Sequence, residues 1–69
     1  MANIETNLKD WRKDKKMSQQ ELAQMIGVRR ETIVHLENNR YNPSLEIALK
    51  IAEIFDCHVE DLFQLKKEK

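Results

Sequence analysis

The chain has 69 residues, of which 41% are hydrophobic and 35% charged, and its twelve basic and twelve acidic residues cancel to a formal net charge of zero. This length fits a single domain over residues 1–69 with a small core, and the single glycine and single proline favour a helical protein over a β-sandwich or a disordered tail. A single cysteine excludes an intrachain disulfide and fits a reducing compartment. The sequence shows neither a signal peptide nor the roughly 18 consecutive apolar residues that a membrane span needs, so we expect a cytoplasmic protein.

The first predicted helix runs from about Asn7 to Lys15 and follows a short lead that can add an edge strand. Thr6 or Asn7 can serve as its N-cap, because both side chains accept hydrogen bonds from free backbone amides. Leu8 and Trp11 fall on one face at helical spacing. We interpret Trp11 as a core anchor, since a platform on which bases stack is usually one of several exposed aromatic residues.

Residues 18–38 carry two short amphipathic patterns that meet at Gly27. The run Ser18-Gln19-Gln20-Glu21 is a capping box, in which two side chains accept each other's backbone amides, and it begins a second helix that runs to about Ile26. Glycine ends a helix readily because it adopts the left-handed conformation without a Cβ clash. Ala23 lies on the inner face and is small enough for another helix to cross close by. This arrangement is typical of a helix-turn-helix, which we interpret as a DNA reader.

A third helix is predicted from about Arg30 to Asn38, with Ile33 and Leu36 pointing inward. Asn39 can end this helix, because asparagine tolerates the left-handed conformation better than most residues do. Pro43 prevents a helix at the residue before it. The outward residues of the third helix are Arg30, Glu31, Val34, His35 and Asn38.

The fourth predicted helix runs from about Leu45 to Phe55, with Ser44 as its N-cap, and it is apolar on two sides. Such a helix is covered on two sides, so we expect the first three helices on one side and a fifth helix or a second subunit on the other. The fifth helix runs from about Val59 to Phe63, and residues 63–65 alternate in the manner of a strand. The two apolar stripes of the fourth helix are Leu45, Ala48, Leu49, Ala52 and Phe55, and Ile47, Ile51 and Ile54.

Several motifs occur together at a characteristic spacing: S-Q-x-E-L-A at the start of the second helix, Gly27, the inward Ile33, L-E-N at the end of the third helix, and N-P-S-L opening the fourth. From about Asn7 to Phe63 the sequence resembles the Cro/CI-type (XRE) helix-turn-helix repressors, and more narrowly their short stand-alone bacterial members. The resemblance implies an all-α, five-helix, lambda-repressor-like domain with its helix-turn-helix core at residues 18–38. Some short members add a small antiparallel sheet, made from the N-terminal lead and the segment after the fifth helix, and dimerise.

The resemblance also implies a partly buried ion pair between Arg12 and Glu37. Three positions depart from the family pattern. Arg29 stands where serine or threonine usually caps the third helix, His58 where serine usually caps the fifth, and Asn39 where glycine is common. Each lost cap costs on the order of 1 kcal/mol of stability. The change at Arg29 also adds a positive charge on the side expected to face DNA.

The resemblance implies binding to operator DNA as a two-fold dimer, with the third helix in the major groove. Phosphate contacts supply most of the affinity in such complexes, and contacts to base edges supply the specificity. Arg30 is placed to chelate a guanine, Glu31 to accept from a cytosine or to orient Arg30, and Val34 to pack on a thymine methyl. The candidate phosphate contacts are Arg12, Gln19, Asn38 and Arg40, and the candidate base contacts are Arg29, Arg30, Glu31, Val34 and His35, of which His35 fits either role.

No motif points to catalysis, a cofactor, a metal or a small-molecule ligand. Cys57 and the two histidines form no C-x-x-C or H-x-x-x-H pair, and we interpret Cys57 as a small buried hydrophobic residue. Three functions stay open: a dimeric repressor that blocks its operator, a DNA-binding antitoxin that also binds a toxin protein, and a protein-interaction module on the same fold. The outward arginines favour the repressor, and we expect a homodimer formed through the isoleucine stripe of the fourth helix, Phe63 and Leu65.

Overall fold

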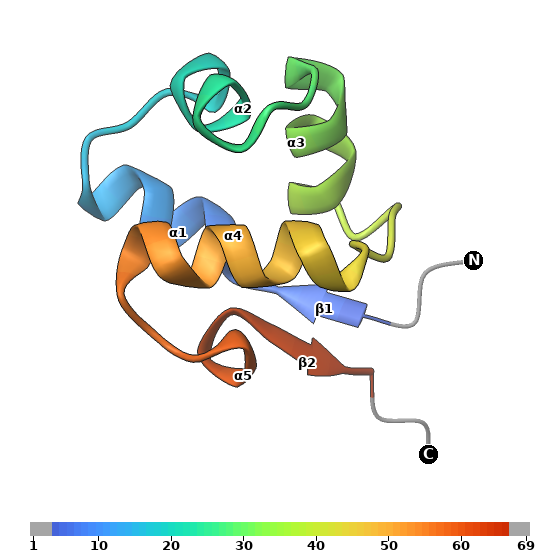
Figure 1. Ribbon diagram of the computed structural model, residues 1–69. Helices are drawn as coiled ribbons and strands as arrows, with labels where there is room; N and C mark the ends of the chain where they lie inside the picture. Colours follow the sequence, from blue (N-terminus) through green and yellow to red (C-terminus); the bar gives the residue numbers. More distant parts are fainter. Residues whose placement is uncertain (1–3, 67–69) are drawn as a thin grey trace.

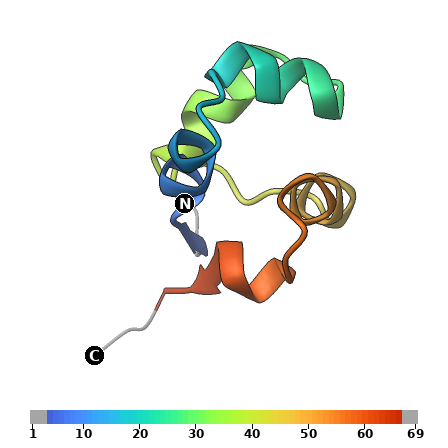
Figure 2. The same cartoon turned by 90° about the vertical axis from the view of Figure 1, so that its left-hand side faces the viewer.

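The computed structural model describes residues 4–66, which form five helices and a two-stranded sheet around one core. The helix α4 crosses the middle of the molecule, with α2 and α3 on one side of it and α5 and the sheet on the other, and the view turned by 90° keeps these two groups apart (Figures 1 and 2). The expected five-helix architecture and the small antiparallel sheet are confirmed. In chain order the elements are β1 (Ile4–Thr6), α1 (Leu8–Asp14), α2 (Gln19–Ile26), α3 (Arg30–Glu37), α4 (Leu45–Phe55), α5 (Val59–Leu62) and β2 (Phe63–Leu65).

The core is a single cluster of apolar side chains to which every helix contributes. Trp11 is half-buried and packs against this cluster, with its ring centroid 6.1 Å from that of Phe55 and the rings tilted by 52°. This tilted contact is a favourable aromatic geometry, and it confirms Trp11 as an anchor at the edge of the core. The largest fully buried side chains are Leu8, Leu22, Ile33, Leu36, Ile51 and Leu62.

One broad apolar face of α4, rather than two separate stripes, packs against the core. Ile51 has no exposed surface, whereas Leu45 and Leu49 are 72% and 53% exposed, so the single chain leaves these two residues of the first stripe uncovered. Because apolar residues fill most positions of this helix, its sequence does not mark one face, and packing against the other helices selects it. The buried residues of α4 are Ala48, Ile51, Ala52 and Phe55, and Ile47 and Ile54 are half-buried beside them.

Four helices are followed by a residue in the left-handed conformation, although the chain holds only one glycine. Gly27 and Asn39 follow α2 and α3 as predicted, with φ of 77° and 59°. Lys16 and Asp56 follow α1 and α4, with φ of 55° and 53°, and neither was predicted. In all four turns the amide of the next residue donates to the carbonyl five positions earlier, over 2.9 to 3.1 Å. These bonds satisfy the last carbonyls of each helix and hold the chain in the turn even where the residue has a Cβ.

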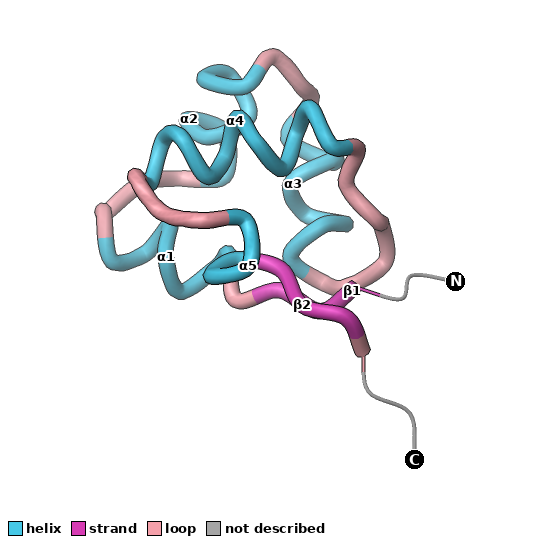
Figure 3. The backbone as a smooth tube through the Cα atoms, turned by 60° about the horizontal axis from the view of Figure 1, so that its bottom comes forward, coloured by secondary structure: helices cyan, strands magenta, loops and turns pink. Residues whose placement is uncertain are grey.

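The antiparallel sheet brings the first and last described segments of the chain together (Figure 3). Thr6 lies opposite Phe63, which begins β2 instead of ending the fifth helix as predicted. The Thr6 hydroxyl donates to the carbonyl of Leu62 at 2.6 Å and accepts from the amide of Leu8 at 3.1 Å. Asn7 makes no side-chain cap, so Thr6 is the residue whose side chain caps α1.

Candidate nucleic-acid interface

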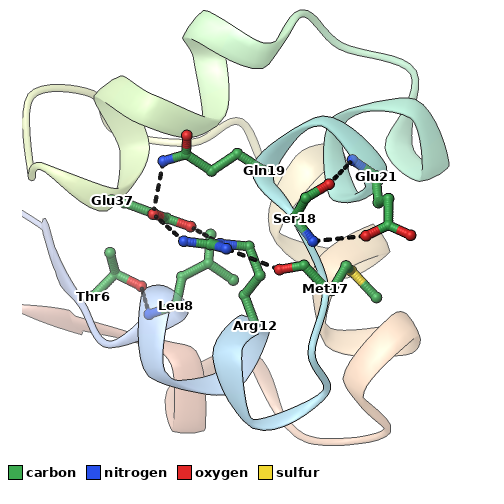
Figure 4. Close-up of polar contacts among 8 residues, drawn as sticks. All are labelled: Thr6, Leu8, Arg12, Met17, Ser18, Gln19, Glu21 and Glu37. Atoms are coloured by element: carbon green, nitrogen blue, oxygen red, sulfur yellow. Dashed lines mark hydrogen bonds and ion pairs between the residues drawn. The ribbon is translucent and has the colours of Figure 1, made fainter.

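The helices α2 and α3 form the predicted helix-turn-helix, joined by the short turn at residues 27–29. The capping box at the start of α2 is present: the Glu21 amide donates to Ser18 Oγ at 3.0 Å, and the Ser18 amide donates to Glu21 Oε1 at 2.8 Å (Figure 4). These bonds, the one from the Ser18 amide most of all, lower the pKa of the Glu21 carboxyl. Leu22 and Ile33 are completely buried between the helices and the core, which fixes the crossing of α2 and α3.

The side of α3 turned away from the core, which we call the outer face of α3, is polar and largely exposed. Val34 is half-buried and marks the border of this face. Arg29 holds the N-cap position without a side-chain hydrogen bond, so the expected loss of this cap is confirmed. Arg29 and Arg30 are both exposed at the N-terminal end of α3. The exposed residues on or beside the outer face are Arg29, Arg30, Glu31, His35, Asn38 and Arg40.

A buried polar network joins α1, the first turn of α2 and the end of α3 (Figure 4). Arg12 Nε donates to Glu37 Oε2 at 2.7 Å and Arg12 Nη2 donates to Glu37 Oε1 at 3.2 Å, which confirms the expected ion pair. Arg12 Nη1 also donates to the carbonyl of Met17 at 2.8 Å. The Gln19 side chain joins the network, since its Nε2 donates to Glu37 Oε1 at 3.1 Å. Sequence reasoning missed this last bond, because no local pattern pairs residues 18 positions apart.

The network separates two of the candidate DNA contacts from the exposed ones. Arg12 is only 8% exposed, and three of its donors are directed at protein oxygens. The side-chain nitrogen of Gln19 is directed at Glu37, while its backbone amide lies in the first turn of α2, where helix amides have no partner within the helix. The structure thus brings Gln19, Glu37 and Arg12 together in one hydrogen-bonded network and leaves the arginines of the outer face of α3 exposed.

A family model described as helix-turn-helix matches residues 8–62, and so covers most of the chain. The chain belongs to the Cro/CI-type (XRE) helix-turn-helix family. A relative described as an uncharacterised HTH-type transcriptional regulator of Archaeoglobus fulgidus is 48% identical over 66 residues, which cover 96% of this chain and 93% of the relative. This XRE-type chain is a transcriptional regulator with a helix-turn-helix DNA-binding fold, and the names of its relatives describe regulators rather than enzymes.

Solved structures of bacterial regulators share the fold of this XRE-type chain. The transcriptional regulator VanUg superposes with a TM-score of 0.77 at 27% identity, over 99% of this chain and 92% of that one. SinR, described as the master regulator for biofilm formation and solved in complex with DNA, superposes with a TM-score of 0.69 at 33% identity, over 77% of this chain and 86% of that one.

Two departures of this chain from the XRE pattern have local compensation. Asn39, in place of glycine, accepts a hydrogen bond from the Thr6 amide through its side-chain oxygen at 3.1 Å. His58, in place of serine, gives no side-chain cap to α5, but its amide donates to the Asp61 carboxylate at 3.0 Å, which is the return bond of a capping box. The loss predicted at His58 is therefore only partial, since one of the two bonds is kept.

Cys57 carries the only thiol of this XRE-type chain. Cys57 is half-buried against the core, somewhat more exposed than predicted. Its burial, followed by the carboxylates of Asp61 and Asp56, raises the pKa of its thiol, so the thiol stays protonated and weakly nucleophilic near neutral pH. No group of three or more potential metal ligands occurs in this part of the chain, and none of its helices has the length and apolar character that a membrane crossing requires.

Proposed function

We propose that this XRE-type regulator is a repressor that binds a palindromic operator as a homodimer, with α3 in the major groove. The observation that carries the proposal is the outer face of α3, which is exposed and carries Arg29 and Arg30 on a helix whose inner residues are buried. The DNA complex of SinR, whose fold matches at 33% identity, supports the same use of this fold.

Specificity in this proposal comes from the outer face of α3. Arg30 donates two hydrogen bonds to O6 and N7 of a guanine, the commonest specific contact in the major groove. Val34, at the border of the face, packs on a thymine methyl, and Glu31 accepts from a cytosine or orients Arg30. Arg29, just before the helix, reaches a neighbouring base.

Affinity in this proposal comes from the ends of α2 and α3. The backbone amide of Gln19 binds a phosphate in the first turn of α2, where the helix dipole favours an anion. Asn38 and Arg40 bind phosphates beyond the far end of α3. We assign Arg12 a positioning role instead of a phosphate contact, because its guanidinium is buried and already bonded to Glu37 and Met17.

The homodimer in this proposal uses the apolar surface that the single chain leaves uncovered. Ile51 and Phe63 are buried in their own core and are not available to a partner, whereas Leu65 is 75% exposed. Two copies joined near β2 present two outer faces of α3 to DNA, and operator half-sites are expected about one helical turn apart, roughly 34 Å. Binding at a promoter then blocks transcription by occupying the site.

The test begins with selection of bound duplexes from a random library, followed by salt titration on the selected operator. Wild-type protein is expected to lose affinity linearly with the logarithm of salt concentration. Arg30→Ala is expected to bind about 10- to 100-fold more weakly and to lose its preference at one base pair. Lys9→Ala removes an exposed cation of α1, outside both the helix-turn-helix and β2, and serves as the matched control.

Two outcomes count against the proposal. Failure of the wild-type protein to bind any duplex in the library excludes sequence-specific DNA binding. Equal effects of Arg30→Ala and Lys9→Ala exclude base reading by the outer face of α3. Transcription from a promoter that overlaps the selected site is expected to fall when the protein is added, and a rise in transcription contradicts the repressor assignment.

A further inference from the structure

A surface hollow lies beside the end of α3, where the chain turns toward α4. It is lined by Thr32 and His35 from α3 and by Arg40 and Tyr41 from the segment that follows. Arg40 is held there by the turn itself, because its amide donates to the carbonyl of His35 at 2.9 Å. Tyr41 packs against the core, which fixes its ring as one wall of the hollow. The hollow is therefore built on rigid support, although it is open to solvent.

The lining has the chemistry of an anion site. It contains one permanent cation, Arg40, one imidazole, and the two hydroxyl groups of Thr32 and Tyr41, with no carboxylate among the lining residues. Within residues 4–66 neither hydroxyl has a protein hydrogen-bond partner. A group with several acceptor oxygens and a negative charge satisfies all of these donors together, and a phosphate is such a group. The tyrosine ring adds an apolar wall against which a sugar can pack.

The position of the hollow favours a phosphate of the DNA backbone over a free ion. His35 belongs both to the outer face of α3 and to the hollow, so an occupant lies directly beside the groove that α3 enters in the proposed complex. Two residues that no sequence pattern marked for binding, Thr32 and Tyr41, become contacts in this way. An occupant of the hollow would give His35 the phosphate role of the two expected from the sequence.

We propose that the hollow formed by Thr32, His35, Arg40 and Tyr41 holds one phosphate of the operator backbone, with its deoxyribose against the Tyr41 ring. This inference rests on the proposed DNA-binding function and adds a defined backbone site to it. Arg40 provides the charge, and the two hydroxyls and His35 provide hydrogen bonds that orient the phosphate. Such a site fixes the register of α3 along the groove without reading a base.

The experiment removes single groups from the hollow and single charges from the operator. Tyr41→Phe and Thr32→Val each delete a hydroxyl without a protein partner and are expected to fold as the wild type does. Each is expected to weaken binding to the selected operator about three- to tenfold, with an unchanged salt slope, because a hydroxyl carries no charge. Arg40→Ala is expected to reduce the salt slope by about one, and Lys9→Ala again serves as control.

Neutral methylphosphonate groups, placed one at a time along the operator, identify the phosphate. At one position per half-site, the methylphosphonate and Tyr41→Phe are expected to reduce operator affinity non-additively, since both remove the same contact. Additive losses of affinity at every position overturn the proposal, and so does wild-type affinity in both hydroxyl variants.

A second experiment titrates the protein with inorganic phosphate and monitors binding through the NMR shifts of the Arg40 and Tyr41 amides. If inorganic phosphate binds saturably while the losses of operator affinity remain additive, the hollow binds free phosphate and the assignment to the DNA backbone is wrong. Absence of DNA binding by the wild type is a different result, which refutes the proposed function itself.

Discussion

The amide of Thr6 donates a 3.1 Å hydrogen bond to the side-chain oxygen of Asn39, and this bond ties the end of α3 to β1. Asn39 adopts φ of 59°, so the same residue turns the chain out of the helix and accepts a bond from a residue 33 positions away. The glycine common at this position performs only the first of these tasks. The hydrogen bond offsets part of the strain that a Cβ brings to the left-handed conformation.

Substitutions of Asn39 separate these two tasks. Asn39→Gly keeps the left-handed turn and loses the bond to Thr6, so we expect an unfolding free energy within about 1 kcal/mol of wild type. Asn39→Ala loses both the bond and the tolerance for positive φ, and we expect a loss of about 2 kcal/mol. Urea denaturation measures both values. Equal stabilities of the glycine and alanine variants contradict the role of the left-handed turn.

The ion pair of Arg12 with Glu37 makes the stability of the domain depend on both partners. Glu37→Ala removes the carboxylate that pairs with Arg12, a residue that is only 8% exposed, and we expect the free energy of unfolding to fall by about 3–5 kcal/mol. Arg12→Leu combined with Glu37→Leu removes both charges and is expected to recover most of that loss. Glu46→Ala, which breaks the exposed pair with Lys50, is the matched control and is expected to cost less than about 0.5 kcal/mol.

A loss of 3–5 kcal/mol unfolds many domains of this size, so a milder variant completes the test of the network. Gln19→Leu removes only the 3.1 Å bond to Glu37 and keeps the side-chain volume, and we expect a loss of about 1 kcal/mol. Urea denaturation of the folded variant measures it. A Gln19→Leu protein as stable as wild type shows that this bond makes no net contribution.

The left-handed residues that are not glycine offer sites for stabilisation. Lys16→Gly and Asp56→Gly relieve the Cβ strain at φ of 55° and 53°, and each is expected to add about 0.5–1 kcal/mol. Asp56→Gly also removes a carboxylate from the negative end of the α4 dipole, and is expected to bring the pKa of the Cys57 thiol closer to its ordinary value. Thermal unfolding measures both variants.

Matched substitutions control for the loss of the side chain at these turns. Lys16→Ala keeps the strained Cβ and is expected to leave the melting temperature near that of wild type, whereas Lys16→Gly is expected to raise it by several degrees. At Gly27 an added Cβ meets no atom within 4 Å, so Gly27→Ala is expected to cost about 1 kcal/mol through the backbone alone. A more stable Lys16→Ala than Lys16→Gly contradicts the strain at this turn.

The features that the sequence predicted are those with local, repeated signals. The inward positions Leu22, Ile33 and Leu36 follow helical spacing in helices that also carry polar residues, so one face is marked. The capping box of Ser18 and Glu21 is a motif of four consecutive residues, so the local sequence is enough to predict it. Such signals were sufficient for the fold class and for the placement of α2 and α3.

The features that the sequence did not predict depend on contacts between distant segments. The exposure of Leu45 and Leu49 follows from how α4 lies on the other helices, and a helix that is apolar at most positions carries no signal for that choice. The Gln19 bond to Glu37 arises only when α2 and the end of α3 are assembled, and the hollow at Tyr41 arises only when the chain after α3 turns back beside that helix. The ion pair of Arg12 with Glu37 was predicted through the family resemblance and not from a local pattern.

The capping box makes the first turn of α2 sensitive to acid. The folded protein lowers the pKa of Glu21 below its ordinary value of 4.5, chiefly through the hydrogen bond from the Ser18 amide. A lowered folded pKa means that the stabilisation is present above the ordinary value and is lost as the pH falls through the lowered one. NMR titration of the Glu21 carboxyl carbon is expected to give a midpoint below 4.5. Ser18→Ala is expected to raise this midpoint only in part, because the backbone bond remains, and a midpoint unchanged from free glutamate contradicts the capping box.

Leu65 tests the proposed homodimer, because it is 75% exposed on β2 and contributes little to the core of its own chain. Leu65→Asp is expected to keep the stability of the single chain within about 0.5 kcal/mol, while the charge disfavours burial against a partner. Sedimentation equilibrium is expected to give a dimer for wild type and a monomer for Leu65→Asp at micromolar concentration.

Met25→Asp is the control for this variant. It changes an apolar side chain that is 58% exposed on α2, on the other side of α4 from β2, and is expected to leave the dimer intact (Figure 1). Since a monomer occupies only one half-site, Leu65→Asp is also expected to bind a single half-site as wild type does and to lose the tighter binding of the full operator. A wild-type protein that stays monomeric on and off the operator refutes the dimer, and a dimeric Leu65→Asp moves the interface away from β2.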